Sequence, residues 1–377
     1  MPGLLLLVIA VVLYGSLYPW DFDFHKPVSG LWMVLHHWPT GLTRGVIFDI
    51  ILNVLLYVPV GALAFLTFAR RRRPRVAALL LAVVLGFAMS VTVEVLQAYD
   101  RGRDAGGLDV ITNTSGAPTG ALLALLFQPA IESLAARGTR RSATAAAILA
   151  VLWGAFQFYP LVPVFRIARL HAGLAFLKQP PVFAPVELWS ATAEWFAIGL
   201  LLEFAAEPLN AVWPAFLMLV IPLRLFIPGR GIGWNDLFGA GLALLLWCGM
   251  RPKRRLGAGA WIMGSAILAY ELAPFHFLAH PQHFSWIPFF ATLGGERQTA
   301  AVIVLRKAFE YGALVWLLHA RGWSYLRSGA LLAAALLGLE LVQRYLPGRT
   351  PESTDAVLAA LMALVLWLAS DFRPGWR

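Results

Sequence analysis

The stretch VAALLLAVVLGFAMSVTVEVLQA, residues 76–98, decides the fold class of this chain. It runs for 23 residues with Glu94 as its single charged residue. Because an α-helix rises 1.5 Å per residue, about 20 apolar residues cross roughly 30 Å of hydrocarbon. In hydrocarbon every backbone N–H and C=O must be paired within the protein, and a helix achieves this within one segment. The stretch therefore predicts a transmembrane helix.

Apolar stretches of similar length recur along the whole chain. The other eleven predicted spans are residues 3–19, 48–69, 109–127, 143–160, 187–205, 209–227, 235–250, 256–274, 300–319, 326–345 and 353–369. The 377 residues are 59% hydrophobic and 13% charged, and a soluble domain would need more charge to cover its surface. We therefore predict an all-α, polytopic transmembrane bundle of about 12 spans.

The formal net charge is +10, but its distribution argues against nucleic acid as a partner. The basic residues cluster at 70–75, 137–141 and 251–255, directly after the second, fourth and eighth predicted spans. Short loops rich in Lys and Arg stay in the cytoplasm. An even number of spans then places both termini there too. This pattern is typical of a multi-pass protein of the bacterial inner membrane.

A polar motif occurs twice with identical spacing. It reads Glu94-x-x-Gln97, Gly102-Arg103 and Asp109 in one copy, and Glu340-x-x-Gln343, Gly348-Arg349 and Asp355 in the other. Glu340 lies 246 residues after Glu94, and the other four positions are displaced equally. Gly229-Arg230 and Asp236 repeat the last part of the motif between them. Self-similarity of this kind indicates duplicated structural units, here predicted as parallel four-helix repeats over residues 1–130, 143–250 and 256–370.

The side chains of the motif are predicted to converge at the outer edge of the membrane. Glu and Gln at positions i and i+3 share one helix face, and the Asp begins the next helix, where it can cap free amides. The candidate ligand-binding residues are Glu94, Gln97, Arg103, Asp109 and Asn113 in the first unit, and Glu340, Gln343, Arg349 and Asp355 in the third. An ionisable residue in a spanning helix is by default a functional hypothesis.

A purely structural role is the alternative, in which Arg clamps the two acidic residues of its unit. The expected pairs are Arg103 with Glu94 or Asp109, and Arg349 with Glu340 or Asp355. The middle unit supports this alternative, because it has Ile221 and Arg224 in place of Glu and Gln yet keeps Arg and Asp. Further candidates for a structural clamp are Arg230, Asp236, Asp49 and Asn53. Lys307 and Glu310 share one helix face and are expected to pair with each other.

Three segments of the first unit resemble a known family. FDIILNVLLYVPVG at 48–61, SVTVEVLQ at 90–97, and Arg103 followed by DVITNTSG at 109–116 are similar to a VanZ-like domain. The resemblance covers residues 14–127 well and residues 266–369 in part. The resemblance implies a bacterial membrane protein that acts in the cell envelope. The family is named for a protein associated with resistance to glycopeptide antibiotics.

The leading hypothesis is that the protein binds or handles a lipid-linked or anionic envelope component at the outer leaflet, since Arg suits phosphate head groups. Its expected partners are membrane lipids and, in addition, a lipid-linked glycan or envelope-assembly proteins. One alternative is a secondary transporter of a small solute. Another is a membrane enzyme acting on envelope lipid or glycan, although no familiar catalytic motif occurs. No residue pattern points to a cofactor or a metal.

Cysteine labelling tests the predicted topology. In a background that lacks Cys248, a cysteine at position 103 is expected to react with a membrane-impermeant reagent added from outside. A cysteine at position 72, within the arginine run, should react only after the cytoplasmic side is opened. Labelling of position 103 solely from the cytoplasmic side contradicts the topology.

Overall fold

The computed structural model describes most of the chain. The described residues are 1–25, 29–41, 43–69, 74–101, 103, 105–128, 143–161, 163–164, 167–205, 213–295 and 297–370. They form helices and, within these ranges, no strand beyond the isolated bridges Phe22–Asp100 and Ser285–Glu352. The predicted all-α class is therefore confirmed. The described residues fall into two compact units, one within residues 1–137 and one within 138–371.

Each of the predicted spans overlaps a helix, and residues 209–212 of one span lie outside the described residues. The first unit contains α1 (Pro2–Ser16), α2 (Gly30–His36), α3 (Arg44–Ala69), α4 (Arg75–Gln97) and α5 (Gly107–Leu126). The long helices of the second unit are α7 (Ala143–Phe158), α9 (Pro185–Ala205), α10 (Trp213–Arg224), α11 (Trp234–Gly249), α12 (Pro252–Leu272), α14 (Arg297–Ala320), α15 (Tyr325–Gln343) and α16 (Thr354–Ser370). Its short elements are α8 (Ile167–Gly173), η1 (Ala175–Lys178) and α13 (Phe290–Gly294).

Three helices among the described residues are long and apolar enough to cross a membrane. They comprise Gly45–Ala69, Arg75–Gln97 and Tyr325–Gln343. The helices Pro2–Ser16, Ala143–Phe158 and Thr354–Ser370 are apolar but shorter. The full count of 12 spans stays a prediction.

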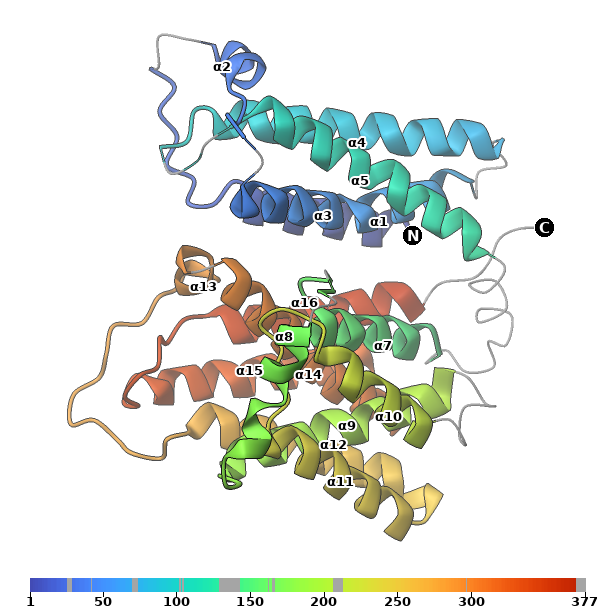
Figure 1. The fold of residues 1–377 in the computed structure, drawn as a ribbon, viewed down its shortest axis with the longest axis vertical. Helices are drawn as coiled ribbons and strands as arrows, with labels where there is room; N and C mark the ends of the chain where they lie inside the picture. Colours follow the sequence, from blue (N-terminus) through green and yellow to red (C-terminus); the bar gives the residue numbers. More distant parts are fainter. Residues whose placement is uncertain are drawn as a thin grey trace. The chain divides into compact units, whose positions relative to one another are not determined.

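The first unit is held together by close approach of α3 and α5. The helices α1, α3, α4 and α5 run side by side, with α3 in contact with the other three (Figure 1). A Cβ atom on Gly120 would overlap the carbonyl oxygen of Val58, and one on Gly116 would overlap that of Val54. A Cβ on Gly61 would overlap Ala117 in turn. Small residues let two helix backbones come into contact. Such close packing promotes helix association in a lipid bilayer, where the hydrophobic effect does not drive helices together.

The second unit contains two further sets of four long helices. In the set α7, α9, α10 and α11, the second helix contacts the first and the fourth. The set α12, α14, α15 and α16 has the same arrangement, as does α1, α3, α4 and α5 in the first unit. Contacts of α9 with α12 and of α14 with α7 join the two sets into one body (Figure 1).

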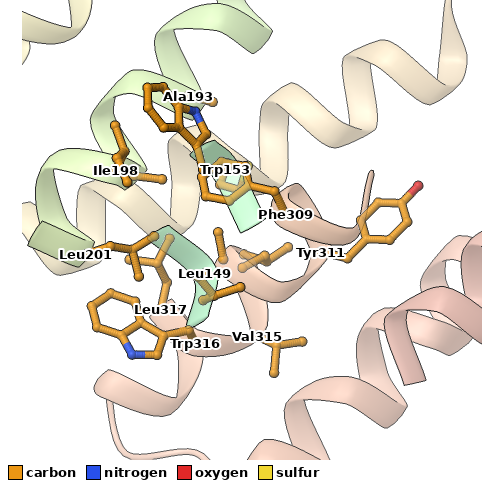
Figure 2. Packing of buried hydrophobic residues seen from close by; sticks show 14 of the residues in the cluster. Leu149, Trp153, Ala193, Ile198, Leu201, Phe309, Tyr311, Val315, Trp316 and Leu317 are labelled. Carbon is orange, nitrogen blue, oxygen red and sulfur yellow. The ribbon is translucent and has the colours of Figure 1, made fainter. Parts of the chain in front are cut away.

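An apolar core rich in aromatic residues fills this second unit. Trp153 on α7 packs edge-on against Trp195 on α9, with ring centroids 4.9 Å apart. Phe309 and Trp316 on α14 are fully buried in the same cluster (Figure 2). Such ring pairs stabilise a core beyond the area they bury. The core holds α7, α9 and α14 in fixed relative positions, and α9 and α14 carry Glu194, Arg306, Lys307 and Glu310, which are described below.

Substitution of Gly120 tests the packing of α3 against α5. Gly120→Ala is expected to destabilise the first unit by about 1–3 kcal/mol or more, because the added Cβ meets backbone that cannot rotate away. The matched control is Gly15→Ala on α1, where a Cβ meets nothing within 4 Å. Thermal unfolding of the purified protein in detergent measures both. Equal unfolding midpoints for the two variants would contradict this account.

Candidate functional site

Arg103 closes the C-terminal end of α1. Its Nε donates to the carbonyl of Tyr18 at 2.7 Å, and its Nη2 donates to the carbonyl of Gly15 at 3.3 Å. Gln97 adds a third donor, with its Nε2 2.7 Å from the carbonyl of Ser16. The last carbonyls of a helix have no partner within the helix. The motif therefore supplies donors where the first helix would leave acceptors unpaired.

The same contact occurs at two other helix ends. Arg349 donates from Nε to the carbonyl of Ala273 at 3.0 Å, and from Nη2 to the carbonyl of Tyr270. Arg230 donates from Nη2 to the carbonyl of Phe156. In each case a cis peptide bond precedes the proline that follows the helix, at Pro19, Pro160 and Pro274. The Nη2 contact with a carbonyl near the helix end thus recurs at three places, while the Nε contact occurs for Arg103 and Arg349.

These contacts overturn part of the expected clamp. Among the described residues, Arg349 pairs with neither Glu340 nor Asp355, and its guanidinium lies 5.2 Å from the ring centroid of Tyr270. Within the same ranges, Arg230 forms no ion pair with Asp236. The physical reason is that each loop turns the guanidinium back to the end of the first helix, where carbonyls lack donors.

The Asp of the motif is bound by a different side chain in each set of helices. The pairs are Asn53 Nδ2 with Asp109 Oδ1 at 2.8 Å, Arg224 Nη1 with Asp236 Oδ1 at 3.0 Å, and Lys307 Nζ with Asp355 Oδ2 at 2.6 Å. Asn53 thus contacts the Asp of its own unit, and Asp49 lies half-buried one turn before it on α3. The Asp consistently ties the fourth helix to a neighbour, while the chemistry of its partner varies.

Glu94 and Glu340 are almost fully buried, at 2% and 3% exposure, and accept equivalent hydrogen bonds. Oε2 of Glu94 accepts from the backbone N–H of Gly106 at 3.2 Å, and Oε2 of Glu340 accepts from that of Glu352 at 3.1 Å. The donor lies 12 residues after the Glu in both cases. Glu94 also accepts from Nδ2 of Asn113 at 3.5 Å, so these two predicted residues do come together.

The third set contains a buried polar network that the sequence did not predict. Lys307 Nζ lies 3.2 Å from a carboxylate oxygen of Glu271 as well as bonding to Asp355. Gln343 Nε2 donates to the other carboxylate oxygen of Glu271 at 2.6 Å, and Tyr311 donates to Glu271 at 3.1 Å. The signal available was Glu271 itself, a charged residue in an otherwise apolar stretch.

The expected pair of Lys307 with Glu310 is wrong. Glu310 binds Arg306 at 3.0 Å, one turn before it on α14. Arg306 also binds Glu194 on α9 at 3.1 Å. Side chains one residue apart point to different faces of a helix, so Arg306 and Lys307 enter two separate networks.

A cavity of about 320 Å³ lies within the second unit beside these networks. Its basic lining residues are Arg224, Arg230, Arg306 and Lys307. Its acidic lining residues are Glu187, Glu194, Asp236 and Glu310. Of these, Arg230, Asp236, Lys307 and Glu310 were singled out from the sequence, and then as structural residues. Among the described residues, no group of three or more His, Cys, Asp or Glu side chains is arranged to hold a metal ion.

A short helix covers the end of the first unit that carries the motif. On α2 the apolar side chains of Leu31, Trp32 and Leu35 are exposed at 52%, 52% and 59%. The backbone N–H of Gly30 donates to the hydroxyl of Tyr99 at 2.9 Å, which ties α2 to the end of α4. Exposed Leu and Trp on a short helix are typical of an element that lies in the membrane interface.

The loop after α1 folds over the same end. Asp23 pairs with Arg101 at 3.1 Å, and its backbone N–H donates to the carbonyl of Tyr99 at 2.7 Å. The backbone N–H of His25 and the guanidinium of Arg101 lower the pKa of Asp23 below its ordinary value. Arg101 keeps 62% of its side chain exposed. The motif end of the first unit therefore presents the Arg101–Asp23 pair together with the exposed apolar side chains of α2.

Comparison with protein families bears on this unit. A family model described as VanZ/LLP1 matches residues 3–128. This segment is a VanZ-like domain. The match includes the stretches 48–61 and 90–116 on which the resemblance rests. The family, together with the long apolar helices, identifies the chain as a membrane protein.

The VanZ-like domain makes up about a third of the chain. Neither the curated proteins nor the solved structures include a match to the chain. The relation of residues 143–370 to the VanZ-like domain stays a prediction, which rests on the shared spacing and on the recurring Arg contacts.

Removal of Lys307 tests the network of the third set. Lys307→Met is expected to destabilise the protein by about 3–5 kcal/mol, because it leaves Glu271 and Asp355 buried without their cation. Lys253→Met is the matched control, since Lys253 is exposed at the start of α12. Chemical or thermal unfolding in detergent gives the comparison. A loss no greater than that of the control would show that the pairs do not stabilise the fold.

Proposed function

We propose that the protein binds or handles a lipid-linked or anionic component of the cell envelope, at the outer leaflet of the bacterial inner membrane. One observation carries the proposal. In the VanZ-like domain, the buried Glu94 and Asn113 lie at the same end as the interfacial helix α2 and the exposed Arg101. A buried acid in a spanning helix is costly to maintain, which favours a functional role. A lipid head group would lie at this level of the membrane.

The exposed side chains at this end fit such a ligand. Trp32 and Trp38 are about half exposed, as in the aromatic belts of membrane proteins. Arg101 offers a planar guanidinium that suits phosphate or pyrophosphate oxygens. The outer leaflet follows from the arginine runs on the opposite side of the predicted spans. A contribution to glycopeptide resistance or to polysaccharide assembly would be the physiological consequence.

Transport of a small solute is a second candidate, favoured by the network of Lys307, Glu271 and Asp355. Carboxyl groups buried in spanning helices can relay protons. The predicted repeats argue against it, because units with an even number of spans all face the same way. Many secondary transporters contain repeats of inverted topology instead.

Arg101→Gln tests the anionic ligand. In nanodiscs, a polyprenyl-pyrophosphate-linked glycan should bind the wild type more tightly than a neutral lipid of equal chain length. Removal of one interfacial charge should weaken that binding roughly fivefold, or about 1 kcal/mol. The matched control is Arg75→Gln, because Arg75 is exposed at the opposite end of α4. Binding is measured by native mass spectrometry.

A wild type with no preference for the pyrophosphate-linked ligand over the neutral lipid would sink the proposal. Equal losses in Arg101→Gln and Arg75→Gln would place the interaction elsewhere. Glu94→Gln tests whether the buried carboxyl group of the proposed site is needed for ligand handling. The amide keeps an oxygen that can accept from Gly106, so membrane abundance should stay normal while ligand handling is lost.

A further inference from the structure

The cavity of the second unit has buried polar atoms without partners in its wall. Among the described residues, Nε of Arg224, Nε of Arg230 and Oε1 of Gln157 form no hydrogen bond. Arg224 is 6% exposed and Gln157 is 2% exposed. A buried donor or acceptor left unpaired costs about 1–3 kcal/mol, and more when it is charged. Three such atoms around one cavity indicate a site built for a polar ligand.

One group of charges in this wall carries a surplus positive charge. Arg224 is neutralised by Asp236, with Nη1 and Oδ1 3.0 Å apart. Arg230 lies beside this pair and, in the part of the chain that the structure describes, has no carboxylate partner. The Nε–H groups of both residues have no hydrogen-bond partner within the described residues. An anion with several oxygens, such as a phosphate, is the group that two guanidinium donors suit.

The other group of charges carries a surplus of carboxylate. Arg306 lies between Glu194 at 3.1 Å and Glu310 at 3.0 Å, so one cation serves two acids. Gln157 adds its unpaired Oε1 to the same cavity. Together these residues offer three acceptors. An ammonium group has three N–H donors and no acceptor, which matches this set.

We infer that the cavity binds a phosphorylated amine, with its phosphate at Arg224 and Arg230 and its ammonium at Glu194, Glu310 and Gln157. The volume of about 320 Å³ lies at the lower end of the range for ligand pockets, which suits a group the size of ethanolamine phosphate. Such a group occurs free in solution or as a phospholipid head group. The site lies outside the VanZ-like domain and does not depend on the function proposed for that domain.

Calorimetry on the purified full-length protein tests the inference with two probes. Ethanolamine phosphate carries both charges, whereas glycerol phosphate lacks the ammonium. The wild type is expected to bind the first about tenfold more tightly, as one additional charge-assisted hydrogen bond provides. Glu310→Gln should remove this preference while glycerol phosphate still binds. Arg230→Gln should weaken both probes.

The control is Glu203→Gln, because Glu203 lies on α9 with Glu194 but outside the cavity lining. It should keep the preference. Nanodiscs with phosphatidylethanolamine or phosphatidylglycerol distinguish a phospholipid ligand from a free phosphorylated amine. If the site binds a phospholipid head group, native mass spectrometry should show preferential retention of phosphatidylethanolamine. Equal affinity for both soluble probes together with no lipid preference would overturn the inference. So would a preference that survives in Glu310→Gln.

Discussion

The unpaired carbonyl groups at the end of the first helix are the constraint on which the rest of the architecture depends. A helix that ends near hydrocarbon leaves acceptors that water cannot reach, and each unpaired group is costly. Arg103, Arg230 and Arg349 meet this need by reaching back from a loop between two later helices. The contact ties the end of the first helix to the loop between the third and fourth helices of the same set.

The Asp of the motif contacts a different side chain in each set. Asp109 accepts a hydrogen bond from the amide of Asn53. Asp236 forms an ion pair with Arg224, and Asp355 forms one with Lys307. The position of the Asp is constant, but the charge around it is not. The same position in each set therefore presents its carboxylate to an amide, a guanidinium or an ammonium group, depending on the neighbouring side chain.

Close packing and buried charge are linked in this protein. Gly116 and Gly120 allow α5 to touch α3, and that approach brings Asn53 within hydrogen-bond reach of Asp109. In the second unit the aromatic core of α7, α9 and α14 holds Glu194 against Arg306. Buried ion pairs contribute stability only when their geometry is excellent. The rigid apolar contacts provide that geometry.

The sequence by itself determined the helical membrane class, the positions of the helices and the membership of residues 3–128 in the VanZ/LLP1 family. These properties depend on local hydrophobicity and on spacing within one segment. Only the tertiary structure decided which charges meet. Lys307 and Asp355 lie 48 residues apart, and Arg306 and Glu194 lie 112 apart, so helical periodicity cannot relate them. Periodicity assigns a residue to a face of its own helix, whereas its partner depends on which helices pack against that face.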